Sequence, residues 1–166
     1  RETGEYRPDP SGTARRSLRY AALSLMLFGN PRAGIAAATA ELEAPHSMSA
    51  EVGALSALVQ VDCPEREAAL DQFHSRHGHE HLLIDKWLML NAQCVGADAA
   101  ARIERLTHHA DFKWTTPNKV YALIAAFTAG NGSGFNAADG STQNVVADAI
   151  IRLDRINPQV ASRIAT

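Results

Sequence analysis

Apolar residues recur at intervals of three and four along most of this 166-residue chain, and no stretch alternates apolar and polar residues as a β-strand does. Gly, Asn or Pro interrupts the pattern between the apolar stretches. The pattern therefore predicts an all-α protein. The predicted helices cover residues 13–28, 31–43, 49–59, 63–76, 82–93, 98–108, 117–128 and 142–156.

The apolar positions also predict which face of each helix is buried. In the first helix they form a stripe of Leu18, Ala22, Leu25 and Met26. In residues 117–128 they are Val120, Ile124 and Phe127. About eight helices of this length, joined by short turns, favour antiparallel pairs in a curved helical repeat, an α-solenoid of the ARM or HEAT type, although no internal repeat is evident.

Capping residues refine the helix boundaries. Ser49 is a candidate cap for the third helix, and Asp62 with Glu65 makes a capping box for the fourth. Asn157 and Pro158 begin a further helix, of which this sequence contains only the part up to Thr166. We therefore expect one helical domain over 1–166 that is a piece of a larger domain, with residues 1–12 as a loose leading segment and the helix from Asn157 truncated.

Composition bears on which partners the protein binds and on where it is located. The formal charge of −2 is too close to balance to favour a nucleic-acid partner. No apolar run approaches the roughly 18 residues of a membrane span, so no membrane partner is expected. Cys63 and Cys94 stand alone in helical surroundings, which is typical of buried thiols in a reducing compartment, and a cytoplasmic location follows as a prediction.

The residue spacing does not match the known metal, phosphate-binding or nucleophile motifs. Four histidines surround Gly78: His74, His77, His79 and His81. They would form a metal site if the turn brought them together. Solvated histidines are the favoured interpretation, because Leu83 occupies the position where a His-Glu-x-x-His motif requires its second histidine. Gly130–Gly134 follows a helix and lacks a P-loop ending, so it is predicted to be a connector. Asp85 and Lys86 are predicted to form an ion pair at a helix start. No catalytic nucleophile motif occurs.

A family resemblance appears when several segments are taken together. They are Arg15–Leu23, Leu83–Trp87, Pro117–Ile124, Phe135–Ser141 and Asn157–Arg163. In this order and spacing the chain resembles the C-terminal helical domain of bacterial aminopeptidase N, a zinc metallo-aminopeptidase of the thermolysin-like class. The resemblance implies a cap that closes over a catalytic domain of the same polypeptide, with the zinc ligands outside this chain.

The resemblance also implies two site residues. Gln159 and Arg163 match family positions that border the substrate cavity, the glutamine beside the pocket for the first side chain and the arginine further along the peptide. Residues four apart share one helical face. Where the family often has arginines this chain has Lys119 and Tyr121, and where the family has a histidine it has Asn136, so any cavity charge from these positions is reduced or moved.

These observations lead to a first hypothesis and two alternatives. The first is the C-terminal cap of a zinc aminopeptidase that acts on peptides, inactive by itself. The alternatives are a free-standing α-solenoid that binds a peptide or protein, and a histidine-based metal carrier. Because further helices of the family are missing after Thr166, we expect apolar surface on the last full helix and self-association of the isolated piece.

Overall fold

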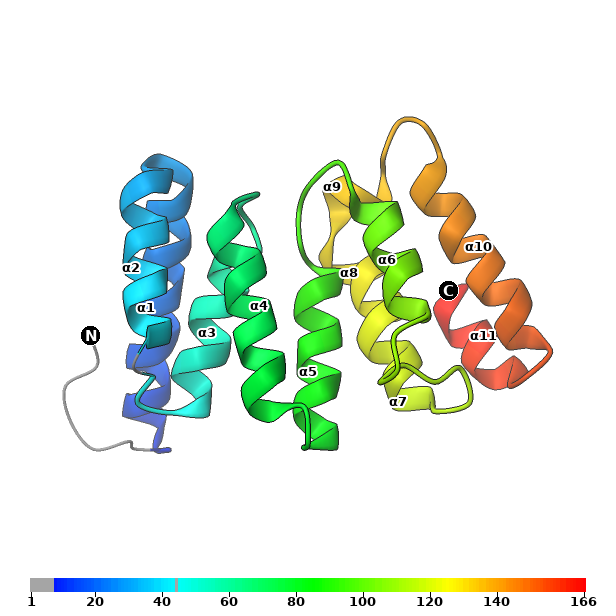
Figure 1. Cartoon of the computed structure of the whole chain (residues 1–166), viewed down its shortest axis with the longest axis horizontal. Coiled ribbons are helices and arrows are strands. Elements are labelled where there is room, and N and C mark those ends of the chain that lie inside the picture. Colours follow the sequence, from blue (N-terminus) through cyan, green and yellow to red (C-terminus); the bar gives the residue numbers. More distant parts are fainter. Residues whose placement is uncertain (1–7, 44) are drawn as a thin grey trace. The chain divides into compact units, whose positions relative to one another are not determined.

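The computed structural model of the chain describes residues 8–43 and 45–166 (Figure 1). Over these residues it contains only helices and their connections, which confirms the all-α prediction. The elements are α1 Pro10–Gly29, α2 Pro31–Glu43, α3 Met48–Leu58, α4 Pro64–His77, α5 His81–Ala92, α6 Ala99–Thr107, α7 Pro117–Val120, η1 Tyr121–Ala125, α8 Ala126–Gly130, α9 Gly132–Phe135, α10 Ser141–Asp154 and α11 Pro158–Ile164.

The helices form two compact units, one ending at Gln72 and the other beginning at Phe73. In the first unit α1, α2 and α3 all pack against one another. Helix α1 begins three residues before its predicted start, because the side chain of Asp9 accepts a hydrogen bond from the backbone N–H of Gly12. Residues 1–7 of the predicted leading segment lie outside the described residues.

The predicted buried face of α1 is wrong. Leu18 and Leu25 are 73% and 72% exposed, whereas Leu23 and Leu27 are buried. Gly34 of α2 lies against Leu27, where an added Cβ would come within 2.7 Å of the Leu27 backbone, so this is the face on which the two helices approach. Because α1 carries large apolar residues on both sides, its periodicity does not identify the buried one.

Two caps differ from prediction. Ser47, not Ser49, caps α3, since its hydroxyl accepts from the N–H of Ala50 at 3.1 Å. Helix α4 begins at Pro64, so Asp62 precedes the cap position. The Asp62 carboxylate instead accepts a hydrogen bond from Arg66 at 2.9 Å. This guanidinium is buried and also bonds Glu67 at 2.8 Å and the carbonyl of Val61 at 3.2 Å, as a buried charge requires.

In the second unit, α5 packs against the continuous helical stretch of α7, η1 and α8. Val120, Ile124 and Phe127 are fully buried there, which confirms their predicted inward face. The stretch is not a uniform α-helix, because the N–H of Ala126 donates to the carbonyl of Tyr121, five residues earlier. This wide turn is the π-helical segment η1.

The glycine-rich connector contains more structure than its composition predicts. Within Gly130–Gly134 the chain begins a short helix, α9, after Asn131. The Asn131 side chain is buried; its oxygen accepts from the N–H of Gly134 at 3.0 Å, and its amide donates to the carbonyls of Ala92 at 3.2 Å and Cys94 at 2.7 Å. These bonds order a segment that glycine content alone predicts to be irregular.

The predicted pairing of Asp85 with Lys86 is also wrong. Asp85 forms its ion pair with Lys119 of α7 at 2.9 Å, and Lys86 is exposed. Adjacent residues of a helix point in different directions, so a neighbour in sequence is poorly placed to pair. Among the described residues no helix is both long enough and apolar enough to cross a membrane.

Candidate functional site

Gln159 and Arg163, the residues predicted to border a cavity, lie on α11. The Asn157 side chain caps this helix by accepting from the N–H of Val160 at 3.2 Å, which confirms the predicted start. Val160 and Ala161 are buried, and α11 packs against α10 and η1. Gln159 and Arg163, four residues apart, are both exposed, so both side chains are accessible on one side of the helix. Their role at a substrate cavity stays a prediction.

The three positions at which the chain departs from the family have different environments. Lys119 is buried; besides its ion pair with Asp85 it donates to the carbonyl of His81 at 3.3 Å. Its charge therefore joins α7 to α5 and is not displayed to solvent. Tyr121 is half-buried in η1, and Asn136 is exposed and donates to the carbonyl of Gly132 at 2.7 Å.

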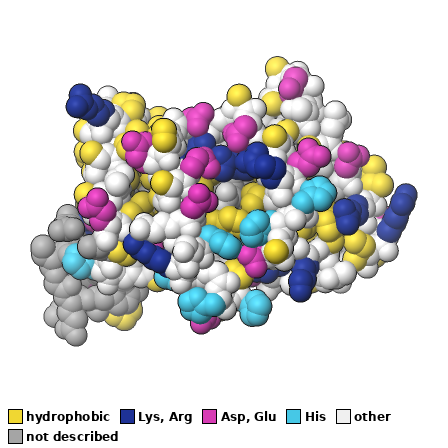
Figure 2. All heavy atoms as spheres, viewed as in Figure 1, with side chains coloured by type: hydrophobic (Ala, Val, Ile, Leu, Met, Phe, Trp, Pro, Cys, Tyr) yellow, Lys and Arg dark blue, Asp and Glu magenta, His cyan; other side chains and the backbone are white. Residues whose placement is uncertain are grey.

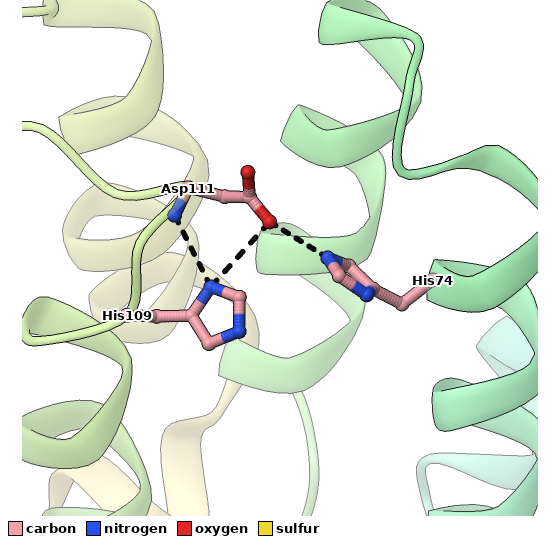
Figure 3. A group of neighbouring side chains, drawn as sticks. All are labelled: His74, His109 and Asp111. Atoms are coloured by element: carbon pink, nitrogen blue, oxygen red, sulfur yellow. Dashed lines mark hydrogen bonds and ion pairs between the residues drawn. The ribbon is translucent and has the colours of Figure 1, made fainter.

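A cluster of potential metal ligands forms around His74, near the end of α4. Figure 2 shows histidine side chains gathered on one face of the molecule, and Figure 3 shows His74, His109 and Asp111 turned toward one another. His74 Nε2 lies 2.7 Å from Asp111 Oδ2, and His109 Nδ1 lies 3.5 Å from the same oxygen. We call these three residues the His–Asp cluster.

The His–Asp cluster rests on an aromatic platform. Trp87 of α5 is buried, with its ring centroid 4.4 Å from that of His74 and 5.0 Å from that of His109. The backbone N–H of Asp111 donates to His109 Nδ1 at 3.2 Å. Both imidazole rings are therefore held by contacts other than the ones they make with the carboxylate.

The other histidines of the predicted group do not join the cluster. His77 packs its ring against Phe73 with centroids 4.8 Å apart, and His79 and His81 are exposed. Sequence reasoning missed His109 and Asp111, which follow α6 and stand 35 and 37 residues after His74. The pair His108-His109 close to Asp111 was the available signal, but nothing in the spacing links it to α4.

Comparisons with known proteins agree with the helical-repeat architecture. A family model described as "Domain of unknown function (DUF3458_C) ARM repeats" matches residues 1–166. The chain is 31% identical to aminopeptidase N of Escherichia coli (strain K12) over 160 residues, which are 96% of this chain and 18% of that protein. It is also 31% identical to aminopeptidase N of Caulobacter vibrioides, over 97% of this chain and 19% of that protein.

A solved structure is similar as well. A crystal structure of Legionella pneumophila aminopeptidase A in complex with aspartic acid matches with a TM-score of 0.86 and 27% sequence identity, over 99% of this chain and 20% of that one. The chain thus spans about a fifth of the length of these relatives.

Proposed function

From the membership of this chain in the DUF3458_C family of ARM-repeat domains, we propose that it is the C-terminal cap domain of a zinc-dependent aminopeptidase N that removes N-terminal amino acids from peptides. The membership confirms the resemblance to the C-terminal helical domain of bacterial aminopeptidase N and the helical-repeat fold. The observation that carries the proposal is the near-complete match of this chain to a fraction of an aminopeptidase N.

In the proposed enzyme this chain encloses the substrate cavity and contributes no group to bond cleavage. The zinc would supply an activated water in the catalytic domain. The sequence contains no His-Glu-x-x-His, so zinc bound in that manner has its ligands elsewhere in the polypeptide. Free-standing peptide binding is the alternative, and the two differ in what is encoded upstream of Arg1.

The test is expression of the complete open reading frame that contains this sequence. We expect it to encode a His-Glu-x-x-His helix upstream and to release amino acids from peptide substrates in a chelator-sensitive manner, while the 166-residue chain alone releases none. A reading frame that starts near Arg1 and yields a stable peptide-binding protein would replace this proposal with the binding-module alternative.

The proposed role of α11 is tested by Arg163→Ala in the complete protein. Loss of a cation along the peptide path should raise KM for tripeptides and longer substrates by roughly fivefold, about 1 kcal/mol of binding, with kcat little changed. Arg155→Ala is the matched control, since Arg155 is also exposed but precedes α11. Equal kinetics of the two variants on a peptide-length series would exclude Arg163 from the cavity.

A further inference from the structure

We propose that His74, His109 and Asp111 form a binding site for a divalent transition-metal ion of the Zn²⁺ class. Each residue offers one donor atom, and the three atoms all lie within 4.8 Å of one another. Two imidazole nitrogens and one carboxylate oxygen form a ligand set that zinc accepts.

The spacing of the three donors suits an ion of this size. Zinc lies about 2.0–2.1 Å from nitrogen or oxygen, which places tetrahedral ligands roughly 3.3 Å apart. The separations of Asp111 Oδ2 from the two ring nitrogens, 2.7 and 3.5 Å, lie on either side of this value. The two histidine rings are neighbours as well, with centroids 5.4 Å apart.

His109 Nδ1 carries the lone pair with which this ring would bind a cation. Because His109 Nδ1 accepts the N–H of Asp111, this nitrogen presents a lone pair, and the ring proton of the neutral form is on Nε2. The N–H of Asp111 occupies this lone pair, so a metal ion bound at Nδ1 would take the place of this hydrogen bond. The ion would then lie between Nδ1 and Asp111 Oδ2, which are 3.5 Å apart.

The surroundings resemble those of a metal site with an open position. The side chains of His74, His109 and Asp111 are 30%, 36% and 28% exposed, so an ion can enter from solvent and keep a water as its fourth ligand. Trp87 orients both rings from the buried side. With two imidazoles and one carboxylate, the set favours Zn²⁺, Ni²⁺ or Cu²⁺ over Mg²⁺ and Ca²⁺, which take mainly oxygen ligands.

Titration calorimetry of the 166-residue chain with ZnCl₂ is the direct test. We expect one equivalent to bind, and His109→Ala and Asp111→Asn each to weaken the binding by at least about tenfold. The control is His79→Ala combined with His81→Ala, because these exposed histidines lie outside the cluster. MgCl₂ should give no binding heat.

Tryptophan fluorescence supplies a second measurement that is specific to this place. In a Trp114→Phe background Trp87 is the only tryptophan, and Ni²⁺ or Cu²⁺ at the cluster should quench it strongly in the parent and weakly in His109→Ala. Circular dichroism must show unchanged helicity in each variant. If His109→Ala loses helicity, the result for Asp111→Asn, which keeps the side-chain volume, tests the proposal instead. Absence of zinc binding, or binding that survives the cluster variants and disappears in the control, would overturn the proposal.

Discussion

Lys119 and Asp85 show how a single buried charge is used to join helices. The ammonium group bonds both the Asp85 carboxylate and the carbonyl of His81, so its charge and part of its hydrogen-bonding capacity are satisfied on α5. The family often has arginine at this position, and the sequence predicts that any cavity charge from it is reduced or moved in this chain. Here the lysine is buried and contributes to the packing of α7 on α5.

Lys119→Met should lower the free energy of unfolding by about 1–3 kcal/mol, because it leaves the largely buried Asp85 without its partner. The cost is below that of a fully buried pair, since Asp85 keeps some contact with water. Urea denaturation followed by circular dichroism measures it. Lys86→Met, at an exposed neighbouring position, is the control and should change stability by less than about 0.5 kcal/mol. Equal effects of the two variants would contradict a role for the pair.

Cys63 provides a prediction about reactivity. Burial raises the pKa of the Cys63 thiol, so less of it is thiolate at a given pH than in the unfolded chain. We expect native Cys63 to react with Ellman's reagent at pH 8 at least about tenfold more slowly than in guanidinium chloride. The variant Cys94→Ala isolates the signal of Cys63. Equal rates in the folded and unfolded protein would show that the thiol is accessible.

At the scale of elements, Asn131 determines the path between α8 and α10. Its side-chain oxygen accepts the N–H of Gly134 in the first turn of α9, and its amide donates to the carbonyl of Ala92 at the end of α5 and to that of Cys94 just after it. Asn131→Ala should therefore cost about 2–3 kcal/mol, since it removes a cap and leaves buried carbonyls unpaired. Asn136→Ala is the matched control, because Asn136 is exposed and its side chain bonds the carbonyl of Gly132 in the same turn. Thermal denaturation of both variants separates them; similar melting temperatures would contradict the role given to Asn131.

The success of prediction from sequence also varies by element. The predicted range 31–43 coincides with α2, because clear helix breakers bound it. The predicted inward residues of 117–128 are correct, because this stretch has a single apolar face. The face of α1 is wrong because both of its sides are apolar and the contact with Gly34 decides between them. The sequence does not predict helix α9, because its order comes from the tertiary hydrogen bonds of Asn131.

The His–Asp cluster illustrates the same limit for a site. The sequence points to His74, and local spacing suggests partners for it among the neighbouring histidines. Its actual partners, His109 and Asp111, lie on a loop that packing brings to the end of α4. Contacts between residues 35 or more positions apart depend on helix packing, which periodicity does not specify.

For the whole molecule, the exposed apolar surface has consequences for behaviour in solution. The sequence predicts such surface on the last full helix, and Ile151 of α10 is exposed, but the larger set lies on α1, with Leu18, Leu25 and Phe28. These three residues are spaced three and seven apart and share one side of the helix. Exposed apolar residues on one side of a helix favour association with other apolar surface.

We therefore expect the 166-residue chain to self-associate at high concentration, and Leu25→Glu with Phe28→Glu to reduce the association without loss of helicity. Sedimentation velocity over a concentration series measures the effect. Ile151→Glu is the comparison, and it should reduce association less because Ile151 lies on α10, away from this set in sequence. A monomer at every concentration would contradict the prediction.

The wide turn at Tyr121–Ala125 has a consequence for tolerated changes in chain length. A hydrogen bond from residue 126 to residue 121 encloses one more residue than an α-helical turn does. Removing a single amino acid inside this turn would restore regular helical bonding, whereas the same deletion elsewhere in Pro117–Gly130 would rotate one end by about 100° and turn buried side chains outward. Natural variants one residue shorter in this helix should therefore carry their gap between Tyr121 and Ala125.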